Sequence, residues 1–282
     1  MRKFPKIRGV STLATGLNQA TPRLPIPPTN APSTPRARSL RSVKEQTLRW
    51  PGGWARIGPW RGSHDIGYLS IGAERPPSAS FVDRCLDALR RDEYSSVVTS
   101  ALAPAETLPF ADRDFVVRER LHLLEHGMSG IERPMLPSRR ARRSDRAPLL
   151  EIDARAFDEF WHIDQLGLEH ALRATPASRF RVCERRASDA ARGEGRSALL
   201  GYAITGRSGL QGYLQRLAVA PEAHRQGWGA SLVADGLRWL ARHGVVRTLV
   251  NTQIKNEAAL ELYKRSGFSL LPVNLVVMDR TL

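Results

Sequence analysis

The stretch 214–268 constrains the fold of this chain more than any other part of its 282 residues. Its first residues, LQRLAVAP, alternate apolar side chains up to Pro221, and because proline cannot donate a ladder hydrogen bond, a strand must end or bulge there. The turn at 224–230 contains two glycines, and apolar residues then recur at helical spacing up to Leu240. A helix entered through glycines presents unpaired backbone N–H groups at its positive end. This unit therefore predicts an anion site of the kind that binds phosphate.

A second strand and a short helix follow directly, and they favour the phosphate interpretation over an ordinary tight strand-to-helix connection. Residues 246–254 have a strand pattern, and residues 256–268 read NEAALELYKRSGF. Asn256 is a residue type that caps helices, because its side chain accepts a hydrogen bond from a backbone N–H in the first turn. Gly267 lies where a helix commonly ends in the left-handed conformation that glycine adopts most easily. We therefore expect a helix that begins after Asn256, carries Tyr263 and ends before Gly267.

Taken together, the strand, the (Q/R)xxGxG/A-type loop, the helix, the next strand and the NxxAxxLYxxxGF segment resemble the GCN5-related N-acetyltransferase (GNAT) superfamily. The resemblance covers roughly residues 149–282. It implies an α/β (α+β) fold with a mixed, mostly antiparallel twisted sheet flanked by helices, and transfer of an acetyl group from acetyl-CoA to an amine. The loop departs from the family pattern at one position, because His224 stands where the family has Gln or Arg, with Arg225 next to it.

The resemblance also implies which residues form the site. The pantetheine part of acetyl-CoA would contact the strand at Leu217 and Val219, where a backbone N–H would polarise the acetyl carbonyl. Tyr263 would be the general acid, because a phenol with an ordinary pKa of about 10 is protonated at neutral pH and can donate to a departing thiolate. The implied cofactor-binding residues are Leu217, Val219, His224, Arg225, Gln226, Gly227, Trp228, Gly229, Ala230 and Asn256.

The general base is not assigned by the sequence. An alkyl amine, with a pKa near 10.4, must lose a proton before it attacks, but Gln215 and Arg216 occupy the strand where the family often has Glu. We expect no metal, because no His, Cys and carboxylate spacing is typical of a metal site. The missing base keeps an alternative open, a non-catalytic acyl-CoA-binding module with a regulatory or interaction role. The candidate carboxylates are Asp153, Asp158, Glu159 and Asp164.

Residues 45–130 repeat the order of elements of the C-terminal half, which we place at 148–282. Strand patterns at 66–71, 95–102 and 115–124 are separated by helix patterns, and FADRDFVVRERLHLL is similar to YKRSGFSLLPVNLVV. This order predicts a degenerate GNAT-like repeat in tandem, with a generic α/β cap domain as the alternative. The region lacks the loop that would bind an anion, because prolines, which have no N–H group, stand where the glycine loop would be. Asp114 also replaces the glycine before Phe115.

The net charge of +15 is concentrated outside the predicted domains. Residues 1–44 contain nine basic residues, no acidic residue and many prolines, which predicts a disordered basic arm. A flexible leader is the favoured interpretation of this arm; a transit peptide and a tether for nucleic acid are the alternatives. Residues 131–147 contain two prolines and a cluster of five arginines, and they predict a solvated linker.

The composition indicates the cellular compartment of the protein and the kinds of partner that it can have. Cys85 and Cys183 lie far apart and predict two buried thiols with no disulfide, which favours a reducing, cytoplasmic compartment. No apolar run is long enough for a membrane span, so we expect no membrane partner. The expected partner is an amine-bearing acceptor, either a small molecule or a protein, and nucleic acid would bind only through the basic arm.

Overall fold

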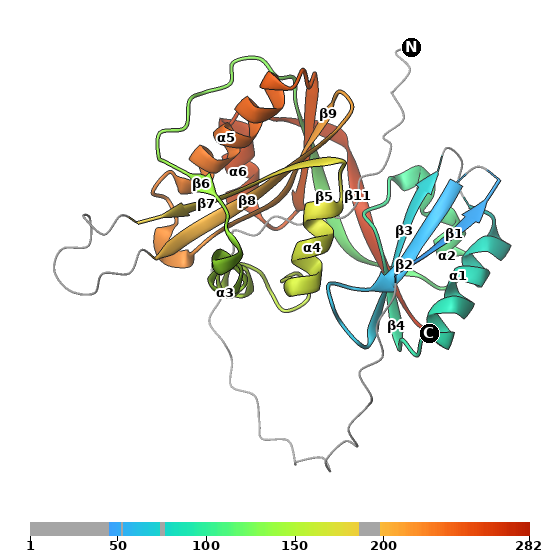
Figure 1. Cartoon of the computed structure of the whole chain (residues 1–282). Coiled ribbons are helices and arrows are strands. Elements are labelled where there is room, and N and C mark those ends of the chain that lie inside the picture. Colours follow the sequence, from blue (N-terminus) through green and yellow to red (C-terminus); the bar gives the residue numbers. More distant parts are fainter. Residues whose placement is uncertain (1–44, 52, 74–76, 186–197) are drawn as a thin grey trace, which may run out of the picture.

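The strands of the protein form one continuous sheet that runs through both halves of the chain (Figure 1). The computed structural model describes residues 45–51, 53–73, 77–185 and 198–282. The basic arm 1–44, residue 52, residues 74–76 of the proline-containing segment and residues 186–197 lie outside the described residues. The strand order is β1-β2-β3-β4-β11-β5-β10-β9-β8-β7-β6.

The strands are β1 (Gln46–Trp50), β2 (Gly53–Pro59), β3 (Ile66–Ala73), β4 (Ser96–Thr99), β5 (Val116–His126), β6 (Arg139–Arg140), β7 (Ala177–Glu184), β8 (Leu199–Ser208), β9 (Gln211–Val219), β10 (Arg247–Gln253) and β11 (Ser269–Thr281). Eight pairings within the described sheet are antiparallel, and the pairs β3/β4 and β9/β10 are parallel. The predicted mixed, mostly antiparallel sheet flanked by helices is confirmed.

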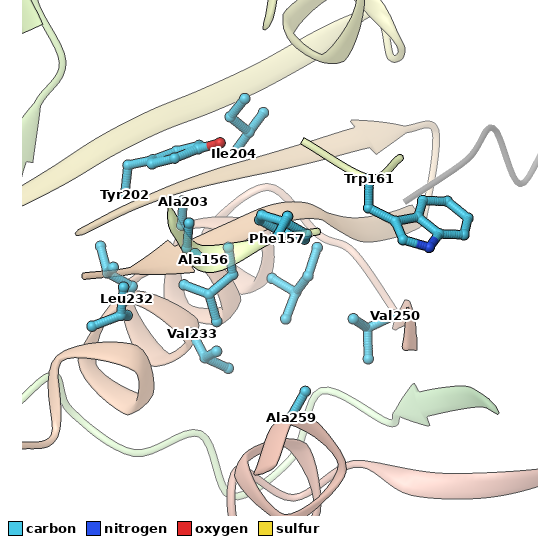
Figure 2. Packing of buried hydrophobic residues seen from close by; sticks show 14 of the residues in the cluster. Ala156, Phe157, Trp161, Tyr202, Ala203, Ile204, Leu232, Val233, Val250 and Ala259 are labelled. Carbon is cyan, nitrogen blue, oxygen red and sulfur yellow. The ribbon is translucent and has the colours of Figure 1, made fainter. Parts of the chain in front are cut away.

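Figure 1 shows α3 and α4 on the opposite side of the C-terminal strands from α5 and α6, while α1 and α2 lie beside β1 to β4. The helices are α1 (Ala79–Arg91), α2 (Leu108–Ala111), α3 (Arg146–Ala156), α4 (Gln165–Arg173), α5 (Trp228–Arg242) and α6 (Glu257–Arg265), with short 3-10 turns η1 (Pro104–Glu106), η2 (Arg143–Asp145) and η4 (Pro221–Ala223). In the buried cluster of Figure 2, Leu232 and Val233 come from α5, Ala259 from α6, and Phe157 and Trp161 from the segment that follows α3.

The two halves contain the same succession of elements. The order β3–α1–β4–α2–β5 in the first half matches β9–α5–β10–α6–β11 in the second, and in each half the first two strands are the parallel pair. α1 forms over the predicted residues, with Phe81, Val82, Cys85, Leu86 and Leu89 buried on its inner face. The predicted repeat of elements is therefore present in the fold.

The last strand of each half completes the sheet of the other half. β5 lies between β10 and β11, whereas β11 lies between β5 and β4. The cores follow this exchange, because Val276 and Met278 of β11 pack in the N-terminal core, and Leu121 and Leu123 of β5 pack in the C-terminal core. Separating the halves would therefore break three antiparallel strand pairings, β5/β10, β5/β11 and β4/β11, and expose apolar side chains of both cores.

The interpretation of residues 131–147 as a solvated linker is wrong for Arg139. Residues 139–140 form β6, the edge strand beside β7. The Arg139 guanidinium donates to Asp145 at 2.7 Å and to Glu184 at 2.7 Å, and this hydrogen bonding holds the pKa of the Asp145 carboxyl below its usual range. Local sequence patterns give no sign of the pair with Glu184, because Glu184 lies 45 positions away and meets Arg139 only in the folded sheet.

Both cysteines are buried and free, as predicted. Burial raises the pKa of each thiol, Cys85 and Cys183, to about 12, so neither is a nucleophile at neutral pH.

Candidate active site

The parallel strands β9 and β10 pair at one end and then separate. Residues 211–213 of β9 are in register with 247–249 of β10, and no pairing continues beyond Tyr213 and Leu249. A β-bulge lies at the point of divergence, since Arg216 opposes Ile204 and Leu214 opposes Thr205, which leaves Gln215 as the extra residue. Within the described part of the chain, the later half of β9 therefore presents one edge without a neighbouring strand.

The backbone of Leu217 and Val219 faces this unpaired edge. Ala220 donates its N–H to the Leu200 carbonyl at 2.8 Å, on the β8 side. Because backbone groups of successive strand residues point to alternate edges, the N–H groups of Val219 and Leu217 point away from β8. The Val219 carbonyl confirms this direction, since His224 Nε2 bonds to it at 3.0 Å. The structure thus places both predicted strand residues at the unpaired edge and gives His224 a structural contact there.

The predicted loop lies at the start of α5 and leaves its backbone donors available. Arg225 and Gly227 both adopt left-handed backbone conformations, with φ of 60° and 85°. Gly227 is the N-cap residue, and no side chain caps the helix. The first intrahelical bond runs from the Ser231 N–H to the Gly227 carbonyl at 3.0 Å, so the N–H groups of residues 228–230 precede the helix ladder. Three donors at a positive helix end match the requirements of a phosphate group.

The start of α5 packs closely against both β9 and α6. A Cβ atom at Gly229 would lie 3.2 Å from Leu262 Cδ2 and 3.8 Å from Val219 Cγ2. The glycine therefore lets the helix start approach the end of β9 and the α6 helix. The amides at the start of α5, the unpaired edge of β9 and the helix that carries Tyr263 therefore lie next to one another.

α6 has the predicted ends. The Asn256 side chain accepts a hydrogen bond from the Ala259 N–H at 3.0 Å, and Gly267 has φ of 88°. Tyr263 is fully buried, and its ring contacts Phe268 edge-on with 5.6 Å between centroids. The capping role of Asn256 is confirmed, whereas a cofactor contact by Asn256 and an acid role for Tyr263 stay predictions.

A buried ion pair connects β9 to α3 on the opposite face of the sheet from α5. Arg216 donates to the two oxygens of Asp153 at 2.7 Å and 2.9 Å, and both side chains are almost completely buried. Asp153 also accepts from the Ile163 N–H at 2.8 Å and from the Tyr202 hydroxyl. Burial raises the pKa of Tyr202 well above its usual value, so the phenol stays protonated as a donor.

Three of the four candidate bases hold structure in the α3–α4 region. Asp153 is filled by its four donors, Asp158 accepts from the Trp161 N–H at 3.1 Å, and Asp164 caps α4 by accepting from the Gly167 N–H at 2.8 Å. Glu159 is exposed. Within the described residues no group of three or more His, Cys, Asp and Glu side chains is arranged to hold a metal ion.

Arg61 joins this face of the site from the N-terminal half, and no sequence signal indicated it. It lies at the turn between β2 and β3, and its Nη1 donates to the Trp161 carbonyl, which also accepts from Arg216 Nη2 at 2.9 Å. Burial of the guanidinium, together with the nearby Arg216 charge, lowers the pKa of Arg61 to about 9. The separation of 100 residues between Arg61 and Trp161 explains why local patterns could not predict the contact.

A surface cavity of about 610 Å³ lies on another side of α5, between residues 134–138, Trp228 and Asp235. The Leu136 N–H donates to Ser231 Oγ at 3.0 Å and so fixes this segment across the start of the helix. The cavity does not include Tyr263 or the unpaired edge of β9. No helix of the described chain is long and apolar enough to cross a membrane.

A splayed parallel strand pair beside a helix entered through glycines, within a mostly antiparallel sheet, defines a fold of the GNAT class. The sequence model of the Acetyltransferase (GNAT) family matches residues 146–268, which is less than half of the chain. A stretch of 56 residues is 39% identical to GCN5-related N-acetyltransferase 7, chloroplastic, of Arabidopsis thaliana. The match spans about a fifth of each protein, 20% of this chain and 20% of the relative.

Solved structures share the fold over most of the chain. A tandem GNAT protein from the clavulanic acid biosynthesis pathway superposes with a TM-score of 0.59 and 12% identity, over 82% of this chain and 79% of that one. A GCN5-related N-acetyltransferase from Kribbella flavida gives 0.54 and 11% identity, over 83% and 89% of the two chains. One from Sphaerobacter thermophilus gives 0.52 and 12% identity, over 80% and 76%. At these identities the likeness concerns the fold.

Proposed function

We propose that the protein is an acetyl-CoA-dependent N-acetyltransferase that acts on an amine of a small molecule or a protein. The observation that carries this proposal is the position of three free helix-start N–H groups, those of residues 228–230, beside the unpaired edge of β9. The match of the GNAT family model to residues 146–268 supports acetyl transfer in general. The buried, free thiols of Cys85 and Cys183 support a reducing compartment such as the cytoplasm.

The binding residues follow from this arrangement. The pyrophosphate of acetyl-CoA would accept from the α5 amides, with the exposed Arg225 adding positive charge. The pantetheine arm would take the place of a strand along Leu217 and Val219. His224 supports this edge from the side, because its ring nitrogen holds the Val219 carbonyl. The Gln or Arg that the family carries at this loop position is therefore replaced by a residue with a local structural contact.

Acetyl-CoA supplies an activated acyl group as a thioester. The attacking amine nitrogen would form a bond to the carbonyl carbon while the carbon–sulfur bond breaks. The N–H of Leu217 or Val219 would stabilise the negative charge that develops on the carbonyl oxygen. The departing thiolate would take a proton from the Tyr263 hydroxyl, and the amine would lose one proton to an acceptor that we do not assign. Holding donor and acceptor together supplies much of the rate.

Calorimetric titration of acetyl-CoA into the full chain tests the proposal first. We expect binding at micromolar concentration, and loss of detectable binding in Gly227→Pro, because proline cannot adopt φ of 85° and removes one N–H from the loop. The matched control is Ser78→Ala at the start of α1, which changes a helix start in the other half and should leave binding intact. Absence of binding to the wild-type chain would overturn the proposal. Binding without turnover on any amine would establish the non-catalytic acyl-CoA-binding module instead.

A further inference from the structure

We propose that the acetyl acceptor carries a carboxylate as well as its amine, and that Arg61 of the N-terminal half binds this carboxylate on the α3–α4 face of the site. The inference rests on the proposed acetyl transfer and names its substrate class, an amino carboxylate. It also gives the N-terminal half a role in the reaction, the recognition of the acceptor.

The face assigned to the acceptor follows from the alternation of side chains along β9. Val219 points toward α5 and α6, since its Cγ2 lies near Gly229, whereas Arg216 points toward α3, where it meets Asp153. The phosphate-binding amides lie on the α5 side. The α3–α4 side of the splayed strands is therefore the side from which an amine can reach the acyl group without crossing the cofactor.

The Asp164 carboxylate lies against Gly62 and caps α4, and Asp153 is the carboxylate that acts on the Arg61 guanidinium. Arg61 and Arg216 bring two guanidinium groups to the same Trp161 carbonyl, and Asp153 is the carboxylate that faces them. Asp153 accepts four hydrogen bonds, two of them from Arg216, which fills the lone-pair positions of a carboxylate. Asp153 therefore neutralises Arg216 and has no acceptor position left for Arg61.

Arg61 has the free hydrogen-bonding capacity that an anion requires. Among the described residues it forms no ion pair, and its buried Nε has no hydrogen-bond partner, while Nη1 is held by the Trp161 carbonyl. The side chain as a whole is only partly buried. The rings of Trp60 and Trp161 contact the guanidinium, at 4.6 Å and 5.2 Å from their centroids. This leaves the planar edge of Nε and Nη2, which matches the two oxygens of a carboxylate.

The β2–β3 turn holds Arg61 in place at a conformational cost. The Ser63 N–H donates to the Trp60 carbonyl at 2.8 Å, and the two central residues, Arg61 and Gly62, have φ of 49° and 84°. A residue other than glycine is disfavoured there. The turn packs tightly on the other half, since a Cβ atom at Gly62 would lie 1.9 Å from Asp164 Oδ2. This packing holds the turn in its unfavourable conformation. An unfavourable backbone that presents an unpaired cation is typical of a binding position.

The test uses pairs of acceptors with the full chain and acetyl-CoA. Glycine, β-alanine and 4-aminobutyrate are each compared with the corresponding carboxamide, and 2-aminoethyl phosphate tests whether a phosphate serves as well. We expect kcat/KM to be about tenfold or more higher for at least one carboxylate than for its amide, as for one charged hydrogen-bonded contact. Arg61→Gln should remove this preference through KM, because kcat/KM should fall much more for the carboxylate than for the amide. Arg61→Lys, which keeps the charge without the planar fork, should retain part of it.

The matched control is Arg56→Gln, an exposed arginine on β2 of the same hairpin, which should keep the full carboxylate preference. An equal loss on carboxylate and amide in Arg61→Gln would show a structural role and overturn the inference. So would the absence of a preference in the wild type, or a stronger preference for the phosphate.

Binding of the best amino carboxylate to the chain without acetyl-CoA, followed by NMR line broadening of the ligand, separates the two proposals. Carboxylate binding that depends on Arg61, in a chain that fails to bind acetyl-CoA, would support the carboxylate site at Arg61 and overturn the acetyl transfer. Acetylation of amines with no carboxylate preference would do the reverse.

Discussion

The same turn follows α2 in the N-terminal half and α6 in the C-terminal half, but the aromatic residue before the turn carries a hydroxyl group only in the C-terminal half. In the C-terminal half the Phe268 N–H donates to the Tyr263 carbonyl at 3.0 Å, and in the N-terminal half the Phe115 N–H donates to the Phe110 carbonyl at 3.2 Å. Both ring pairs are edge-on, with centroids 5.6 Å and 5.3 Å apart. The fold therefore places an aromatic ring at this position in both halves, whereas only the C-terminal half has a phenol there.

The starts of the equivalent helices α1 and α5 also differ between the two halves. α1 begins at Ser78, whose hydroxyl accepts from the Phe81 N–H at 3.2 Å and so satisfies one of the free donors. α5 begins at the left-handed Gly227 with no side-chain cap. A capped helix start is stabilised by its own residue, and an uncapped one keeps its N–H groups for a ligand. Of the two halves, the C-terminal half alone has both the free amides and the phenol.

The largest effect that distinguishes the halves is expected at their ion pairs. Asp153→Asn leaves the buried Arg216 charge without a counter-charge, and we expect it to lower the free energy of unfolding by about 3–5 kcal/mol. Asp83 pairs with Arg113 at 2.8 Å in the N-terminal half, but its side chain is half exposed, so Asp83→Asn should cost much less. Urea unfolding of both variants measures the difference. Equal losses would show that burial does not set the strength of these pairs.

The next effect concerns the hydroxyl that the halves do not share. Tyr263→Phe should lower kcat by about 100-fold, the lower end of the contribution of a general acid, and leave acetyl-CoA affinity unchanged. We expect little loss of stability, since Phe110 occupies the equivalent position in the same ring pair. Steady-state kinetics, calorimetry and thermal unfolding measure the three quantities.

The reciprocal change, Phe110→Tyr, is the control for this comparison. It places a hydroxyl in a fully buried position, so it should lower the free energy of unfolding by about 1–3 kcal/mol and leave kcat unchanged. An unchanged kcat in Tyr263→Phe would remove the acid role of the phenol, even if the rest of the site binds the cofactor.

The smallest effect is a pH dependence at the exchanged strand. His126 of β5 contacts the ring of Phe268, and its Nδ1 accepts from the Met128 N–H at 2.9 Å, which requires the neutral form of that nitrogen. Burial lowers the pKa of His126 below its usual value near 6.5. Because the unfolded chain then binds the proton more readily, the stabilisation is complete above pH 6.5 and is lost as the pH falls through 6.5 toward the folded-state pKa.

Urea unfolding at pH 7.5, 6.5 and 5.5 checks this pH dependence. His126→Gln should reduce the fall in stability between these values, and His64→Gln, at an exposed histidine of the N-terminal half, should not. An unchanged fall in His126→Gln would assign the pH dependence to other groups.

Local features of the site could be predicted because short-range physics determines them. Asn256 caps α6 and Gly267 takes a left-handed conformation because the first N–H groups and the last turn of a helix impose these requirements on adjacent residues. Asp114, which replaces the glycine in the first half, also adopts a positive φ of 57°, as the repeat in the sequence implies. The loop of residues 224–230 likewise forms where its glycines allow it.

Contacts between distant residues could not be predicted from the same patterns. Arg139 was assigned to a solvated linker, although Asp145 and Glu184 bind it in the folded chain. Asp153 stood among the candidate bases, although Arg216, 63 positions away, occupies it. An isolated charge in a sequence gives no sign of its partner, because the free energy of a buried pair depends on desolvation and geometry that exist only after packing.

The sequence by itself determined the order of the elements from β3 to β5 and from β9 to β11, the start of α5, the ends of α6, and the repeat of one unit in both halves, since helix and strand periods and cap residues act within a few positions. The tertiary structure decided that β5 and β11 exchange places and that Arg61 reaches the Trp161 carbonyl. With the same local patterns, β5 could pair with β4 of its own half, and β11 could pair with β10 of its own half. The choice between these pairings rests on the apolar area that the two shared cores bury, and that area is a property of the whole chain.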